Sequence, residues 1–259
     1  MDYIIAIASH KRKSILEQRT LTFLNKHNID FSNVYVFVSS DSYEEYIELQ
    51  EKYKFNLIQN VNDKFNDSIL QTRNNIIEYF EEGEKIIELD DDVKNIEKLE
   101  KNKKNESIEN LNDLFNNCFA QLNGSGLFGF CSKNNSFFAS CCTKYGLYSI
   151  VNSCLGYIND KRIFLTVREK EDFERSLQFY TLGLPIIKFA QYGIDTIYWK
   201  NRGGIQSHYN FEQRKIIQRS SALELILKYP NLCYITTRKN GITDIKFKYF
   251  KNNKNKIKI

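Results

Sequence analysis

The sequence predicts an α/β domain with a mainly parallel central sheet that is flanked by helices. In the first half of the chain, short apolar runs rich in β-forming residues alternate with stretches of helical periodicity, which is typical of such a sheet. Polar clusters follow the first and fourth of these runs. The 259 residues, 42% of them hydrophobic and 14% aromatic, are enough to bury the core of one large domain.

The apolar runs of the first half are expected to be buried parallel strands, and helices are expected between them. Ser14 with Glu17, and Ser42 with Glu45, show the capping-box pattern that starts a helix. A third helix is expected over residues 68–80. Ligands of such sheets bind beyond the carboxyl ends of the strands, so the residues that follow each strand are candidates for chemistry. The expected strands are residues 3–8, 33–38, 55–58 and 85–89.

The second half is expected to be more mixed. Residues 94–107 are highly charged and are expected to form an exposed loop or a frayed helix. Leu127 to Thr166 is rich in glycine, cysteine and aromatic residues, which favours mixed or antiparallel strands. Asn240-Gly241 between two β-prone runs predicts a hairpin. Helices are expected over residues 108–122, 171–182 and 211–229.

We therefore expect a single domain with three parts. Residues 1–93 are expected to form a nucleotide-binding half and residues 108–232 an acceptor and catalytic half. The hairpin and a basic tail follow over residues 233–259, and the last fourteen residues contain six lysines and no acid.

Composition narrows the classes of protein. The formal net charge of +5 is compatible with an anionic ligand or polymer. No run of about 18 apolar residues occurs, so we expect a soluble, intracellular protein without membrane insertion. Six cysteines in a chain of this length lack the density of a disulfide scaffold, which favours reduced, mostly buried thiols. A metal site at Cys141 and Cys142 is the alternative, although no Cys-x-x-Cys pair supports it.

Three aspartates, Asp90, Asp91 and Asp92, directly follow the fourth apolar run. Clustered carboxylates repel one another unless a cation neutralises them. Hard oxygen ligands suit Mg²⁺ or Mn²⁺, which usually bridge a few carboxylates to substrate phosphates. The triplet therefore predicts a divalent metal site, with a solvated acidic turn as the alternative.

This pattern resembles the GT-A class of glycosyltransferases, which carry an Asp-x-Asp motif at a strand end of a nucleotide-binding sandwich. The resemblance implies that Asp90 and Asp92 bind the metal, with Asp91 between them on the donor side, and that the donor is a nucleotide sugar, most typically a UDP-sugar. Arg73, in Thr72-Arg73-Asn74, matches an arginine near the nucleotide and is expected at the diphosphate or base; an ordinary surface arginine is the alternative. The uracil and ribose positions match residues after the first two strands that are equally compatible with helix capping: Ser9, His10, Arg12, Ser40 and Asp41.

Lys170-Glu171-Asp172-Phe173-Glu174 resembles the Glu-Asp motif at the start of a helix in inverting GT-A enzymes. The resemblance implies that Asp172 takes the proton from the acceptor hydroxyl, with Glu171 and Glu174 as lesser candidates. Acids in the first turn of a helix are also favoured simply by the helix dipole.

Residues 200–209 follow as a glycine-containing loop. The paired glycines permit close approach to phosphate, Arg202 is a candidate for neutralising the leaving diphosphate, and His208 is a candidate metal ligand. His27, at the end of a helix, is expected to be structural.

The order of these motifs resembles the compact glycosyltransferase family associated with TET/J-binding-protein hydroxylases, which includes the base J glucosyltransferase and viral and phage relatives. This resemblance implies an acceptor like a hydroxymethylated pyrimidine in DNA, with the basic tail along the phosphates and aromatic residues such as Phe247, Tyr249 and Phe250 nearby. A base in a duplex would have to be flipped out. A sugar, lipid headgroup or protein side chain stays open as acceptor.

Two other classes stay open. A nucleotidyltransferase also uses metal-binding aspartates at strand ends, but it needs a glycine-rich phosphate loop after the first strand, and the sequence shows none there. A catalytically inactive domain that binds a nucleotide or nucleic acid would keep the fold without needing Asp172.

Overall fold

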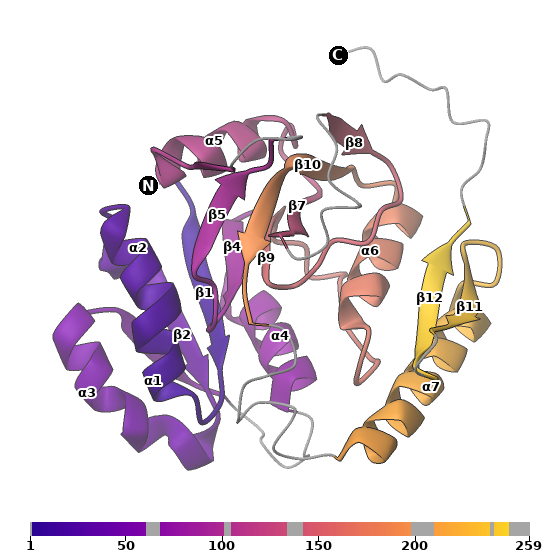
Figure 1. The fold of residues 1–259 in the computed structure, drawn as a ribbon, viewed down its shortest axis with the longest axis horizontal. Helices are drawn as coiled ribbons and strands as arrows, with labels where there is room; N and C mark the ends of the chain where they lie inside the picture. Colours follow the sequence, from indigo (N-terminus) through magenta and orange to yellow (C-terminus); the bar gives the residue numbers. More distant parts are fainter. Residues whose placement is uncertain are drawn as a thin grey trace.

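The computed structural model describes residues 2–60, 68–100, 105–133, 142–197, 210–238 and 241–248. Within these residues, a ten-stranded sheet runs through the molecule in the order β3-β2-β1-β4-β9-β7-β10-β5-β6, with β8 paired to β10. Figure 1 shows the strands at the centre of the molecule with helices around them. The predicted α/β class, a largely parallel sheet flanked by helices, is confirmed.

The parallel part of the sheet comes from the first half of the chain, as predicted. β1 pairs in parallel with both β2 and β4, and β2 pairs in parallel with β3. Helical segments connect these strands, and the segment after β1 consists of two α-helical pieces around a π-helical turn. The strands are β1 (Ile4–Ser9), β2 (Val34–Val38), β3 (Asn56–Gln59) and β4 (Lys85–Asp90), and the helical segments are α1 (Lys13–Leu16), η1 (Glu17–Leu21), α2 (Thr22–Lys26), η2 (Phe31–Asn33), η3 (Ser40–Ser42), α3 (Tyr43–Tyr53) and α4 (Ser68–Tyr79).

Neither predicted capping box is formed. The first helix begins at Lys13, so Ser14 lies inside it, and the Ser14 hydroxyl accepts a hydrogen bond from Gln18 instead of capping the helix. Ser42 does lie at the N-cap of α3, but it makes no side-chain cap bond and its hydroxyl bonds to Ser39. The positions of these helices were therefore predicted more accurately than the capping hydrogen bonds at their N-termini.

The second half completes the sheet with mostly antiparallel strands, as predicted. β9 is antiparallel to β4 and β7, β10 is parallel to β7, and β5 lies between β10 and β6 in antiparallel pairing. The helices of this half begin and end close to the predicted residues. Its elements are β5 (Asn95–Lys98), β6 (Glu106–Ser107), α5 (Leu111–Ala120), β7 (Leu127–Ser132), β8 (Thr143–Tyr145), β9 (Cys154–Ile158), α6 (Glu171–Thr181), β10 (Ile186–Asp195) and α7 (Phe211–Lys228).

Strands β5 and β10 differ from the prediction, and so does the two-residue strand β6, which also lies within the expected loop. Residues 95–98 form β5 rather than an exposed loop, because Ile96 is completely buried and pairs with Ile194 of β10. The ten-residue strand β10 was not predicted at all. Strands β5 and β10 are stabilised by pairing with distant parts of the chain, which local composition does not show.

The helices divide the core into two layers, one on each face of the sheet. One apolar cluster joins α1 to α3 and α5 to side chains such as Ile5, Ile7 and Leu89. The other joins α4 and α6 to the alternate positions, such as Ala6 and Ile86. This alternation is the period of two expected for a sheet covered on both faces.

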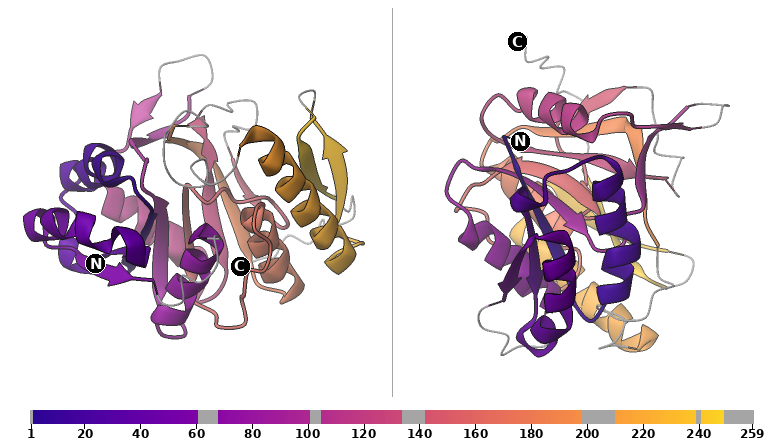
Figure 2. Two further views of the ribbon diagram at one scale, coloured as in Figure 1. Left: turned by 90° about the horizontal axis from the view of Figure 1, so that it is seen from below. Right: turned by 90° about the vertical axis from the view of Figure 1, so that its left-hand side faces the viewer.

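The predicted hairpin is present as β11 (Cys233–Thr237) paired antiparallel with β12 (Thr243–Phe247). It packs with α7 on a third, smaller apolar cluster that includes Leu225 and Phe247. Figures 1 and 2 place α7 and the hairpin at one edge of the molecule, beyond α6. No helix among the described residues is long and apolar enough to cross a membrane.

Candidate functional site

The carboxyl ends of β1 and β4 lie side by side, and polar side chains join them. Ser9, the last residue of β1, donates a hydrogen bond to the Asp91 carboxylate at 2.8 Å. Arg12 reaches the other carboxylate oxygen of Asp91 at 2.9 Å. Tyr46 of α3 bonds to Ser9 and to the backbone N–H of Arg12. The structure thus brings together the segments that follow the first and fourth strands, which are the two polar clusters that the sequence singles out.

The three aspartates have different surroundings. Asp91 is buried and paired as described, and burial raises the pKa of its carboxyl to about 6. Asp92 is also largely buried, with Arg12 at 3.9 Å from its carboxylate. The Asp90 side chain is the most accessible of the three, at 34% exposure. Asp91 is therefore a structural partner of Arg12, while Asp90 presents its carboxylate to solvent.

Arg73 lies in a different place from that predicted. Its side chain is 1% exposed, and it pairs with Glu88 of β4 and, at 2.5 Å, with Asp90. A guanidinium buried in this way does not reach a diphosphate directly in the arrangement described. Its contact to Asp90 instead orients the most accessible carboxylate of the three aspartates.

Glu88 is the centre of a buried ionic cluster that sequence reasoning missed. It is fully buried, and it accepts hydrogen bonds from Arg73, from Arg175 at 2.8 Å and from Tyr157 at 3.1 Å. These two arginines hold the pKa of the Glu88 carboxyl low against the effect of burial. A lone glutamate inside the apolar run 85–89 was the available signal, since a buried charge needs partners.

The predicted catalytic helix α6 begins close to the end of β4. The backbone N–H of Asp90 donates to the carbonyl of Ser153, and the adjacent Asn152 donates its side-chain amide to Glu171 at 3.0 Å. One turn further along α6, Arg175 is bound to Glu88 of β4. The Glu-Asp pair and the aspartate triplet are therefore held at one edge of the sheet.

Both acids at the start of α6 titrate above their usual range. Burial, reinforced by the neighbouring Asp172 charge, raises the pKa of Glu171 to about 7. Burial raises the pKa of Asp172 to about 6, although Lys170 and the helix backbone act in the opposite direction. Carboxyls with pKa values near neutrality are suited to proton transfer.

The segment after β2 also carries polar contacts. His10 hydrogen-bonds with Ser39 at 2.6 Å, and Ser39 donates to Asp41. Lys11 pairs with Asp41 at 2.5 Å, and its hydrogen bond lowers the pKa of that carboxyl. His10 and Asp41 are thus brought together, and Ser40, between Ser39 and Asp41, is exposed.

Two backbone positions beside the site have positive φ although neither residue is glycine. Lys11, after β1, has φ of 53°, and Lys170, directly before α6, has φ of 67°. Left-handed backbone at non-glycine residues is unfavourable, and such positions gather at functional sites.

Several predicted residues lie outside the described part of the chain. These are Arg202 and His208 of the expected loop, Cys141, and Tyr249 and Phe250 of the tail. Within the described residues, no group of three or more acidic, histidine or cysteine side chains is placed to hold a metal. Among the described residues, Asp90 and Asp92 are the two predicted metal ligands, and two carboxylates are the small number that Mg²⁺ usually takes from protein when it binds substrate phosphates.

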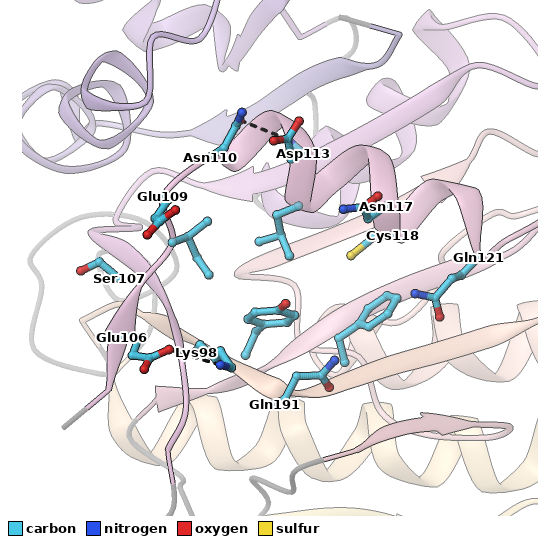
Figure 3. Close-up of a pocket in the computed structure, with 14 residues that line it drawn as sticks. Lys98, Glu106, Ser107, Glu109, Asn110, Asp113, Asn117, Cys118, Gln121 and Gln191 are labelled. Carbon is cyan, nitrogen blue, oxygen red and sulfur yellow. Dashed lines mark hydrogen bonds and ion pairs between the residues drawn. The ribbon is translucent and has the colours of Figure 1, made fainter. Parts of the chain in front are cut away.

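A cavity of about 400 Å³ lies elsewhere, between α5 and strands β5, β6 and β10. Figure 3 shows Asn110, Asn117 and Gln121 of the α5 region on one side and Gln191 of β10 on the other. None of the residues predicted for the site lines this cavity.

No protein-family model matches the sequence, and no curated protein matches it. Among solved structures, S. aureus TarS 1–349 is similar, with a TM-score of 0.52 and 15% identity over 87% of this chain and 66% of that chain. The same TarS segment in complex with UDP gives a TM-score of 0.51 at 14% identity, with equal coverage. This chain thus spans just under two thirds of the length of TarS 1–349.

The fold is of the GT-A type. This confirms the fold that the Asp-x-Asp pattern implied. Identities of this size show the fold alone, and neither structure points to the family associated with TET/J-binding-protein hydroxylases that the motif order resembles.

Proposed function

We propose that this chain is a glycosyltransferase that moves a sugar from a nucleotide-sugar donor to a hydroxyl acceptor. One observation carries the proposal. The aspartates after β4 and the carboxyls at the start of α6 lie at the same edge of a GT-A-type sheet, tied together through Ser153, Asn152 and Glu88. In open α/β sheets this edge is where ligands bind.

The donor side of the site is assigned to the ends of β1, β2 and β4. Ser9 and Arg12 hold Asp91 in place, and His10 and Asp41 lie at the neighbouring strand end, where base and ribose would be read. Asp90 and Asp92 would hold Mn²⁺ or Mg²⁺, which when bound neutralises charge on the diphosphate. UDP is the first nucleotide to test, because a structure of similar fold was solved in complex with UDP.

The acceptor side is assigned to the start of α6. Asp172 takes the proton from the acceptor hydroxyl as its oxygen forms a bond to the anomeric carbon. The bond from that carbon to the diphosphate breaks, and the nucleoside diphosphate leaves with the electron pair. Attack from the side opposite the leaving group inverts the anomeric centre, and the raised pKa of Asp172 suits this role.

The identity of the acceptor is the most specific part of the proposal. A hydroxymethylated pyrimidine in DNA is the acceptor implied by the order of motifs, and a hydroxyl of a glycan, lipid or protein is the alternative. Transfer assays with a duplex containing hydroxymethylcytosine, set against the unmodified duplex, distinguish them. Equal labelling of both duplexes, or of neither, removes the DNA acceptor.

A domain that binds a nucleotide without catalysis is the second candidate. It is favoured by the arginines that already neutralise two of the aspartates, Arg12 on Asp91 and Arg73 on Asp90. Hydrolysis of the donor in the presence of Mn²⁺ separates the two, because only an active transferase breaks the bond to the anomeric carbon.

The decisive experiment measures thermal stability and donor hydrolysis together. UDP or a UDP-sugar with Mn²⁺ should raise Tm, since a ligand that binds the native state stabilises it. Asp92→Ala should lose the Mn²⁺-dependent part of this rise. Asp172→Asn should keep the rise and lose turnover. Asp113→Asn is the matched control, because Asp113 also lies in the first turn of a helix.

Two results would overturn the assignment. One is normal turnover by Asp172→Asn or Asp92→Ala. The other is a Tm that no nucleotide raises, with or without Mn²⁺.

A further inference from the structure

The positive charge of the chain is concentrated in its last fifty residues. Residues 210–248, which include α7 and the hairpin, contain eight lysines and arginines and three acids, and residues 249–259 contain four lysines and no acid. Residues 210–259 contain twelve lysines and arginines and three acids, an excess of nine positive charges, whereas the whole chain has a net charge of +5. Residues 1–209 therefore have an excess of four negative charges. Arg219, Arg238, Lys246 and Lys248 are exposed in this region. Such segregation of charge favours an anionic partner for α7 and the hairpin.

One face of α7 exposes aliphatic side chains. Ile216 is 69% exposed, Leu223 47% and Leu227 82%. At 3.6 residues per turn, these three positions fall within roughly 40° of one another around the helix axis. The opposite face carries the residues of α7 that are buried, such as Ala222 and Leu225. An amphipathic helix on a protein surface normally turns polar residues outward. We therefore expect a binding partner to cover this stripe of exposed aliphatic side chains.

The stripe adjoins a groove that joins apolar and basic groups. The groove, about 480 Å³ in volume, lies between α7 and the hairpin. Ile216 and Leu223 line it together with Ile235 of β11. Lys215 and Arg219 line it as well, as does Glu212, which pairs with Lys215 at 2.9 Å. Aliphatic side chains and cations thus line the same groove. The ribbons of α7 and the hairpin lie at one edge of the molecule in Figures 1 and 2.

We propose that α7 and the β11–β12 hairpin dock on an anionic lipid membrane. Exposed aliphatic side chains can enter the boundary between headgroups and acyl chains, while lysine and arginine pair with anionic headgroups. The association is peripheral, because no described helix is long and apolar enough to cross a bilayer.

Other occupants satisfy only part of this surface. A nucleic acid would neutralise the cations, but it would leave Ile216, Leu223 and Leu227 in water. A second copy of the chain would cover the stripe, but it would bring two strongly basic surfaces together, which is unfavourable. A lipid surface of negative charge satisfies both features. The proposal stands independently of the proposed glycosyl transfer.

The test measures cosedimentation of the full chain with vesicles. Vesicles of phosphatidylcholine with phosphatidylglycerol should retain the protein, and vesicles of phosphatidylcholine alone should retain much less. Leu223→Gln with Leu227→Gln should weaken partitioning roughly tenfold or more. Arg219→Gln, which removes one cation that lines the groove, should weaken it about fivefold. Tyr145→Gln, which changes a side chain 61% exposed on β8, is the control and should bind as the unaltered chain does.

All the substituted residues are exposed, so each variant should unfold within a few degrees of the unaltered chain. If the double leucine variant does not fold, Leu227→Gln alone replaces it in the vesicle assay. Equal retention by both kinds of vesicle, or unchanged binding of the leucine variant, overturns the proposal. Binding to duplex DNA that is insensitive to the leucine changes, or a dimer in gel filtration that these changes dissociate, would assign the surface to nucleic acid or to a second copy instead.

Discussion

At the scale of single residues, Glu171 and Asp172 are the candidates for proton transfer, because of where they lie and how they titrate. Both lie at the start of α6 beside the end of β4, and both have pKa values raised by burial. A carboxyl that is withdrawn from water is harder to ionise, and it is a stronger base once ionised. Such a group is unfavourable for folding at neutral pH and useful for accepting a proton.

The first prediction concerns the pH dependence of transfer. If Asp172 is the base, it must be ionised, so kcat/KM should fall as pH drops through about 6 and reach a plateau above it. Glu171→Gln should show the same fall of kcat/KM at low pH, whereas Asp172→Asn should abolish activity at every pH. Initial rates measured over a pH series check this. If kcat/KM of Glu171→Gln no longer falls at low pH, Glu171 rather than Asp172 is the base.

The second prediction concerns stability and follows from the same shifts. The folded chain binds these protons more tightly than the unfolded chain does. The stability gained in this way is therefore fully present below the ordinary values of 3.8 and 4.5 and is lost as pH rises through about 6 and about 7. Asp172→Asn and Glu171→Gln should each raise the free energy of unfolding at pH 8, on the order of 1 kcal/mol.

The check is urea unfolding at pH 8 and at a pH below both ordinary values, where the difference between each variant and the unaltered chain should close. Variants that are less stable than the unaltered chain at pH 8 would show that hydrogen bonds from Asn152 or the helix backbone outweigh the burial.

Single residues also show which contacts of the site could be predicted from the sequence and which could not. The approach of Ser9 and Arg12 to the aspartates follows from strand order, and the structure shows it. The burial of Arg73 against Glu88 does not follow. Glu88 lies 15 residues from Arg73 along the chain, and the other arginine bound to Glu88, Arg175, lies 87 residues from Glu88. An isolated arginine on a predicted helix looks the same whether it faces solvent or a buried acid.

At the scale of elements, the buried cluster around Glu88 connects α4, β4 and α6. Arg73 comes from α4, Glu88 from β4 and Arg175 from α6, and both arginines are 1% exposed. The cluster therefore fixes the position of the helix that carries Glu171 and Asp172 relative to the strand that carries Asp90. Removing one partner leaves a charge that is buried without full compensation, which is strongly unfavourable.

The third prediction compares a buried arginine with an exposed one. Arg175→Met should destabilise the fold by about 3–5 kcal/mol and lower Tm on the order of 10 °C. Arg162→Met removes an ion pair with Asp160 in which the arginine is 61% exposed, and it should change stability by less than about 1 kcal/mol. Differential scanning calorimetry of both variants checks this. Equal melting of the two would mean that Arg73 alone compensates Glu88.

Elements with strong local patterns were predictable, and those made by pairing were not. The helices α5, α6 and α7 and strands β1, β2 and β4 follow the apolar periodicity of their own residues. Strand β5 has a charged composition and exists because Ile96 inserts beside β10. The π-helical turn at Glu17–Leu21 also has no signal in the composition of its own residues that we recognise.

At the scale of the whole molecule, the ten-stranded sheet and the α7–hairpin unit differ in how they are held. β1 lies between β2 and β4, and its central residues Ile5, Ala6 and Ile7 are completely buried. The hairpin is a separate two-stranded sheet, an arrangement that is marginal by itself. It is held by the small third cluster, by the ring contact of Phe173 with Phe247 and by Lys170 near Asp244.

The fourth prediction follows from this difference and concerns hydrogen exchange. Amides of β1 and β4 should exchange only through opening of the whole fold, whereas amides of β11 and β12 should exchange at a lower free energy, because opening the hairpin exposes only its own cluster. Exchange followed by mass spectrometry at several urea concentrations separates the two, since global opening depends on urea much more steeply than local opening does. A hairpin with the protection and urea dependence of β1 would show that the cluster around Leu225 and Phe247 unfolds as one unit with the main sheet.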